Sequence, residues 1–265
     1  MQAPPHKFST FVRVGYFSRA VLYIVLGLIG LTSASDLQQG TDGIFLAIRD
    51  YPAGTALLWL MVLGFTFYGL FRLASTLFDI EHHGSDRKGW LARIGHAASA
   101  IGHFALAFTA YGFATYAPDD GSGAQQAAAG LLAITLGGTV LGLLGLCFVF
   151  AGFQQVKEGL AGTFMQYISR QAPDQTRMLG TAGYLARAVV FVIIGWSLIQ
   201  AGFLSGNAQG VKTLGEAVAS LSGSGIWFTL VAAGLLVFGL FSLILARYRI
   251  IPELDLKRRI PAFRA

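Results

Sequence analysis

Charged side chains are scarce in this chain. Asp, Glu, Lys and Arg make up 12% of its 265 residues, and hydrophobic residues make up 54%. A soluble domain carries about 25% charged residues, so this chain lacks the polar surface of an ordinary water-soluble fold. We therefore expect a membrane protein.

The chemistry of most enzymes and cofactor proteins is also missing. The single Cys147 excludes an intrachain disulfide, and the sequence holds no HExxH, GxSxG or phosphate-binding loop. His96 and His103 are seven residues apart, about 10.5 Å along a helix, which is too far to bind one metal. No other apolar segment carries a histidine that could complete a haem site. We expect no catalytic residue, no metal and no cofactor.

Long apolar segments are abundant. A helix needs about 20 mostly apolar residues to cross a bilayer, and six segments meet this requirement: 14–34, 56–78, 96–116, 136–156, 184–204 and 226–247. The first could be read as a signal peptide, but related segments recur at 96–116 and 184–204, so we expect it to be retained.

The basic residues predict the orientation of the spans. Of the 19 Lys and Arg residues, only Arg49 and Lys212 fall in the connections on one side. The others cluster at the two termini and in the second-to-third and fourth-to-fifth connections. By the positive-inside rule, we expect both termini to lie in the cytoplasm. This distribution favours contact with anionic lipid, including at the basic tail 251–265, and gives no indication of nucleic-acid binding.

One phrase occurs three times. It reads Gly15-Tyr16-Phe17-Ser18-Arg19-Ala20-Val21, Gly95-His96-Ala97-Ala98-Ser99-Ala100-Ile101 and Gly183-Tyr184-Leu185-Ala186-Arg187-Ala188-Val189. Each copy opens an apolar segment, and a second apolar segment closes the unit. We infer repeat units at about 8–80, 88–165 and 176–250 within one membrane domain. Each outer connection holds a short amphipathic stretch that we expect to lie as a helix on the membrane surface.

The repeat predicts the architecture. Every unit enters and leaves the membrane on the same side, so the three units share one topology. We expect an all-α membrane protein of six transmembrane helices, built as three parallel-topology helical hairpins around a pseudo-threefold axis. A linear row of hairpins is the alternative.

The recurring Gly-Tyr-x-x-Arg-Ala-Val, followed by an aromatic residue and Gly, resembles a bacterial membrane family. The aromatic and glycine positions are Tyr23 and Gly27, then Phe191 and Gly195, and the chain closes with Arg247-Tyr248-Arg249. The family is known only as domain of unknown function number 1206, with three tandem two-helix repeats. The resemblance implies a fold and a membrane location, and it brings no activity.

Polar and aromatic residues form a stripe on each opening segment. Their spacing of three or four residues places them on one helix face. The members are Tyr16, Arg19 and Tyr23, then His96, Ser99 and His103, then Tyr184, Arg187 and Phe191. An ionisable residue within a span indicates function, so we hypothesise that the stripes face the axis and attract an anion. Alternatively, the arginines reach lipid phosphates and the aromatics form an interfacial belt.

The closing segments carry pairs of glycines that we expect to allow close helix packing: Gly64 and Gly69, Gly145 and Gly152, Gly234 and Gly239. Two function classes follow. The first is a small transporter or channel for an anion or small solute. The second is a non-catalytic scaffold or partner subunit of a larger complex.

Overall fold

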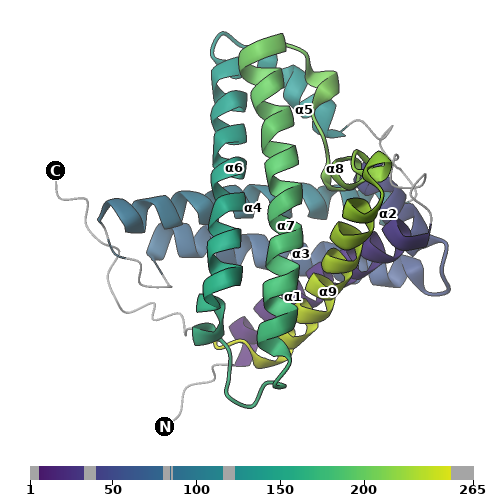
Figure 1. Ribbon diagram of the computed structural model, residues 1–265, viewed down its shortest axis with the longest axis vertical. Coiled ribbons are helices and arrows are strands. Elements are labelled where there is room, and N and C mark those ends of the chain that lie inside the picture. The colour runs from purple at the N-terminus through teal and green to yellow at the C-terminus, as the bar shows by residue number, and fades with distance from the viewer. Residues whose placement is uncertain (1–5, 33–39, 80–83, 85, 116–122, 252–265) are drawn as a thin grey trace.

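The structure is a computed structural model that describes residues 6–32, 40–79, 84, 86–115 and 123–251. In these residues the fold is helical (Figure 1). Six long helices are α1 (His6–Thr32), α3 (Gly54–Phe78), α4 (Arg87–Ala114), α6 (Gly137–Ala161), α7 (Thr176–Ile199) and α9 (Ile226–Tyr248). All six are long and apolar enough to cross a membrane. The prediction of a six-span, all-α membrane protein is confirmed.

The helices begin and end at residues suited to those positions. The Asp86 side chain caps α4 by accepting a hydrogen bond from the Gly89 amide at 2.9 Å. Gly162, with φ 69°, ends α6, and Gly225, with φ 60°, precedes α9. Glycine adopts positive φ without strain, so the chain can turn sharply there. After α7, the helix widens into a π-helical turn, η3 (Gln200–Ser205).

The long helices pack in antiparallel pairs drawn from successive units. Figure 1 shows α3 beside α4 and α6 beside α7, with α1 and α9 crossing obliquely between the two pairs. The closing helix of each predicted unit therefore pairs with the opening helix of the next, and α9 of the last unit pairs with α1 of the first. Further interfaces join α1 to α3 and α7 to α9.

This cyclic order is the one expected of three units around an axis, but the ring is open at one place. Neighbours in the cycle share extensive interfaces, whereas the described residues of α4 and α6 do not form one. The sequence did not predict this difference between the second hairpin and the other two.

Glycines lie where the helices of a pair come closest. A Cβ atom on Gly145 would lie 2.6 Å from the carbonyl oxygen of Gly195, and one on Gly239 would lie 2.7 Å from the backbone nitrogen of Ile24. The other closing-helix glycines also face a neighbour: Gly64 faces Ser18, Gly69 faces Phe104, Gly152 faces Val192 and Gly234 faces Ala186. Small residues permit such backbone contact between membrane helices.

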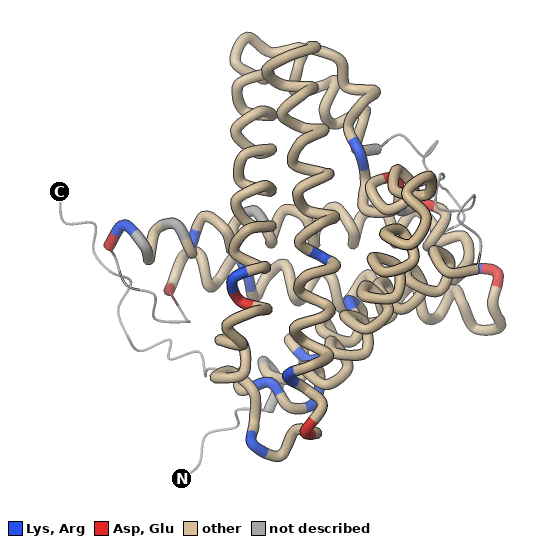
Figure 2. Tube along the Cα trace, in the orientation of Figure 1, with Lys and Arg blue, Asp and Glu red and all other residues tan. Residues whose placement is uncertain are grey.

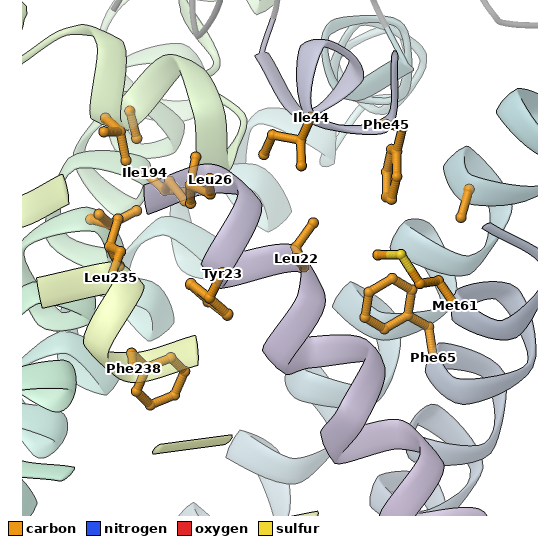
Figure 3. Packing of buried hydrophobic residues seen from close by; sticks show 14 of the residues in the cluster. Leu22, Tyr23, Leu26, Ile44, Phe45, Met61, Phe65, Ile194, Leu235 and Phe238 are labelled. Atoms are coloured by element: carbon orange, nitrogen blue, oxygen red, sulfur yellow. The ribbon is translucent and has the colours of Figure 1, made fainter. Parts of the chain in front are cut away.

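Three short helices lie in the connections that the sequence predicts to be outer: α2 (Gly40–Arg49), α5 (Gly123–Leu132) and α8 (Leu214–Ala219). α2 packs against the bundle through its apolar residues, because Ile44 and Phe45 are fully buried, and its position on the membrane surface stays a prediction. Figure 3 shows both side chains pointing toward residues of α1 and α3. α2 also packs against α8, so these two helices cover the outer end of the bundle.

Charged residues lie mainly at helix ends. Figure 2 shows most Lys and Arg toward the left end of the α3–α4 pair and the lower ends of the other long helices. The few charged positions farther along the helices define the candidate site.

Candidate functional site

Arg19 on α1 lies inside the helix bundle. Its side chain is 6% exposed, and its Nε donates a hydrogen bond to Ser242 Oγ on α9 at 3.2 Å. Its Nη1 lies 3.5 Å from the hydroxyl oxygen of Tyr68 on α3. The guanidinium carbon is 4.7 Å from the centre of the Tyr16 ring and 5.1 Å from that of Phe238. Aromatic rings and the hydroxyl oxygens of Ser242 and Tyr68 therefore surround this cation.

Arg187 occupies the equivalent position on α7 and is half-buried. Its guanidinium carbon lies 4.5 Å from the centre of the Phe191 ring and 5.1 Å from that of Phe238. The same phenylalanine therefore contacts both Arg19 and Arg187. Arg187 Nε is buried and has no hydrogen-bond partner among the described residues.

Two histidines of α4, His103 and His96, lie in the same region as these arginines. His103 is buried, and its Nδ1 donates a hydrogen bond to the backbone oxygen of Ser99 at 2.7 Å. The His103 ring is 4.4 Å from that of Tyr68, and the charges of Arg19, Arg72 and Arg187 act on it. His96 Nδ1 accepts a hydrogen bond from Arg72 Nη1 at 3.0 Å.

The structure places all three stripes inside or at the edge of the bundle. Tyr16, Arg19, Tyr23 and His103 are buried, and the remaining members are half-buried: His96, Ser99, Tyr184, Arg187 and Phe191. A shallow pocket lies at the start of α7, beside Arg177 and Leu185. No stripe residue lines it.

Sequence reasoning missed the closing-helix members of this cluster. Tyr68 accepts hydrogen bonds from Arg72, the nearer at 2.9 Å, and Ser242 accepts one from Arg19. Gln155 on α6 is also buried. A signal was present: Arg72, Gln155 and Ser242 each stand three residues after a predicted packing glycine, namely Gly69, Gly152 and Gly239.

The cluster suits an anion better than a metal. The described residues hold no group of three His, Cys, Asp or Glu side chains that could bind a metal ion. The hydrogen bonds that Arg19 makes to described residues go only to hydroxyl oxygens. A buried cation without a carboxylate partner is costly, and an incoming anion would relieve this cost.

The family of the chain follows from a comparison of sequences. The profile of the Domain of Unknown Function family DUF1206 matches residues 14–79 and 182–249, together about half of the chain. The chain belongs to the DUF1206 family.

The two DUF1206 matches cover α1 to α3 and α7 to α9, which correspond to the first and third predicted units. The matched residues do not include His96, Ser99 and His103. These residues belong to the copy of the repeated phrase that differs most from the other two copies. The chain is also similar to "Uncharacterized protein YxxB" of Bacillus subtilis (strain 168), with 27% identity over 249 residues that cover 90% of each chain. No solved structure matches.

Proposed function

We propose that this DUF1206 protein binds a small anion at the arginine cluster and carries it across the bacterial cytoplasmic membrane. The proposal is supported by the position of Arg19 and Arg187 and by the groups that surround them. Both lie within spans, both contact Phe238, and no carboxylate among the described residues accepts a hydrogen bond from either of them. Two guanidinium groups that share one aromatic neighbour repel each other, so an anion between them is favourable.

The coverage of one end of the bundle supports entry of the anion from the opposite end. Arg19 and Arg187 lie near the middle of α1 and α7, and α2 packs against α8 at one end of the bundle. We place both termini in the cytoplasm because the basic residues gather at the opposite end. The basic segments there are proposed to contact anionic lipid headgroups.

The close packing of the cluster favours a second candidate function, a non-catalytic scaffold or partner subunit. Tyr16 is 1% exposed and Arg19 is 6% exposed, so this conformation leaves little room for water beside them. In a scaffold, Arg19 would serve helix packing through its bond to Ser242 and the surrounding rings.

Transport in reconstituted liposomes separates the two functions. Wild-type protein should take up chloride or inorganic phosphate faster than empty liposomes, and Arg19→Ala with Arg187→Ala should abolish the difference. Arg170→Ala is the matched control, because Arg170 is an exposed arginine in the connection before α7. A scaffold predicts no uptake by the wild type and tolerance of Arg19→Lys, which keeps the charge but loses the planar fork.

A further inference from the structure

The shallow pocket at the start of α7 is a groove on the surface of the bundle, at the lower end of the α6–α7 pair in Figure 1. Its volume is about 560 Å³. The residues that line this α7 groove are Asp174, Arg177, Met178, Thr181, Ala182 and Leu185. None of them belongs to the arginine cluster, so the α7 groove is separate from the proposed anion site.

Glycines at the end of α6 leave room beside the α7 groove. Thr181 Oγ1 donates a hydrogen bond to the backbone oxygen of Gly159 at 2.8 Å, which links the two helices at this level. A Cβ atom on Gly159 would lie 3.8 Å from Cγ of Leu185, and one on Gly162 would lie 3.1 Å from Nε of Arg177. Because both positions are glycine, α6 places no side chain over Leu185 and Arg177 from them.

The polar end of the α7 groove carries one acid and one base. Asp174 and Arg177 are both exposed, and neither forms an ion pair with a described residue. The apolar span that contains α7 begins at Thr176, so both charges lie where the span meets the headgroup region. The groove therefore offers a carboxylate and a guanidinium at the same level of the membrane.

The rest of the α7 groove is mostly apolar and follows the helix into the span. Met178 is 65% exposed, and Ala182 is also exposed. Arg177 and Leu185 are eight residues apart, about 12 Å along a helix, whereas the hydrocarbon of one leaflet is about 15 Å deep. An acyl chain can therefore lie against the groove through most of its leaflet while its headgroup stays beside Asp174 and Arg177.

We propose that the α7 groove binds a phospholipid that carries a primary amine, phosphatidylethanolamine. The Arg177 guanidinium donates to the phosphate oxygens, and the Asp174 carboxylate accepts a charge-assisted hydrogen bond from the ammonium group. The inference is independent of the proposed anion function.

The same pair of charges disfavours other phospholipids. An anionic phospholipid without an amine brings its phosphate beside Asp174 with no cation of its own to offset the repulsion. A choline headgroup has no N–H to donate to a carboxylate, and quaternary ammonium groups are recognised by aromatic rings. No aromatic residue is among the described residues that line the groove.

The test measures lipid binding to the purified full-length protein in detergent by native mass spectrometry. Phosphatidylethanolamine, phosphatidylcholine and phosphatidylglycerol with identical acyl chains are titrated in turn. The wild type should bind phosphatidylethanolamine about 10-fold more tightly than the other two lipids. Asp174→Asn should remove this preference, and Arg177→Gln should weaken phosphatidylethanolamine binding by a similar factor. Arg170→Gln is the matched control, because it removes the same charge from an exposed position in the same connection, outside the groove.

Ala182→Phe gives a further variant that fills the apolar part of the α7 groove from an exposed position and keeps both charges. It should also weaken phosphatidylethanolamine binding. Loss of the preference in Asp174→Asn, with the preference kept in Arg170→Gln, supports the inference. Equal binding of the three lipids by the wild type, or the wild-type preference in all three groove variants, overturns it. An equal loss in Arg170→Gln also overturns it, because any basic residue near the headgroups would then serve.

Discussion

Arg19 Nε on the first spanning helix donates a hydrogen bond to Ser242 Oγ on the last, 3.2 Å away, and both residues are buried. Ser242 Oγ in turn donates to the backbone oxygen of Phe238 at 2.8 Å. These hydrogen bonds link α1 to α9 at the arginine cluster.

Ser242→Ala should therefore destabilise the protein. It leaves the buried Nε of Arg19 without its acceptor, which costs about 1–3 kcal/mol. A thermal unfolding midpoint in detergent, measured against wild type, checks the effect. Ser222→Ala, at an exposed serine, should leave the midpoint unchanged, and equal midpoints for all three proteins would contradict the assigned role of Ser242.

Two Gly→Ala substitutions should change the free energy of unfolding in opposite directions. Gly145→Ala places a methyl group 2.6 Å from the Gly195 carbonyl oxygen, so it should force α6 and α7 apart and cost about 1–3 kcal/mol. Gly102→Ala on α4 meets no atom within 4 Å and should stabilise the helix by up to about 1 kcal/mol. Denaturation of both variants measures the difference. A stable Gly145→Ala protein would show that α6 and α7 do not pack through this glycine.

The outer helices should loosen when Glu216 is removed. Glu216 Oε2 accepts a hydrogen bond from the Thr213 amide at 2.6 Å, and Gln125 Nε2 donates to Glu216 Oε1 at 3.1 Å. Glu216→Ala abolishes the capping box of α8 and the link to α5, and it should cost about 0.5–2 kcal/mol. Hydrogen exchange should rise in α5 and α8 and stay low in α9. Gln209→Ala, at an exposed outer side chain, serves as the control.

The orientation of the chain can be tested with single cysteines. In a Cys147→Ser background, a cysteine is placed by Asn207→Cys at the outer end or by Arg170→Cys at the basic end, both at exposed positions. A membrane-impermeant maleimide should label the Asn207→Cys protein in intact cells and the Arg170→Cys protein only after lysis. The reverse pattern would invert the proposed topology.

The spans could be predicted from sequence because length and hydropathy are local properties. The segment 56–78 became α3 (Gly54–Phe78), and 226–247 became α9 (Ile226–Tyr248). The span predicted at 96–116 lies in α4, whose apolar part is Ala92–Ala114 and whose helix begins earlier, at Arg87. The helix continues through polar residues such as Arg93, whose Nε donates to the Thr76 backbone oxygen, and hydropathy does not detect a helix of that composition.

The site could be predicted only in part. Spacing of three and four residues put the opening-helix stripes on one face, and Tyr16 and Arg19 are indeed buried. The partners of Arg19 could not be found this way, because Ser242 lies 223 residues away. Arg72 looked like one more cytoplasmic basic residue, since its contact with His96 depends on how α3 and α4 pair.

Direct binding of an anion to purified protein is the measurement closest to the central claim. Radiolabelled phosphate and chloride are titrated against the wild type, the Arg19→Ala and Arg187→Ala variants, and the Arg170→Ala control. The account predicts saturable binding of at least one anion by the wild type and the control, and a loss of about 10-fold or more in affinity in each cluster variant. Absence of saturable binding by the wild type, or equal affinity in all four proteins, would contradict it.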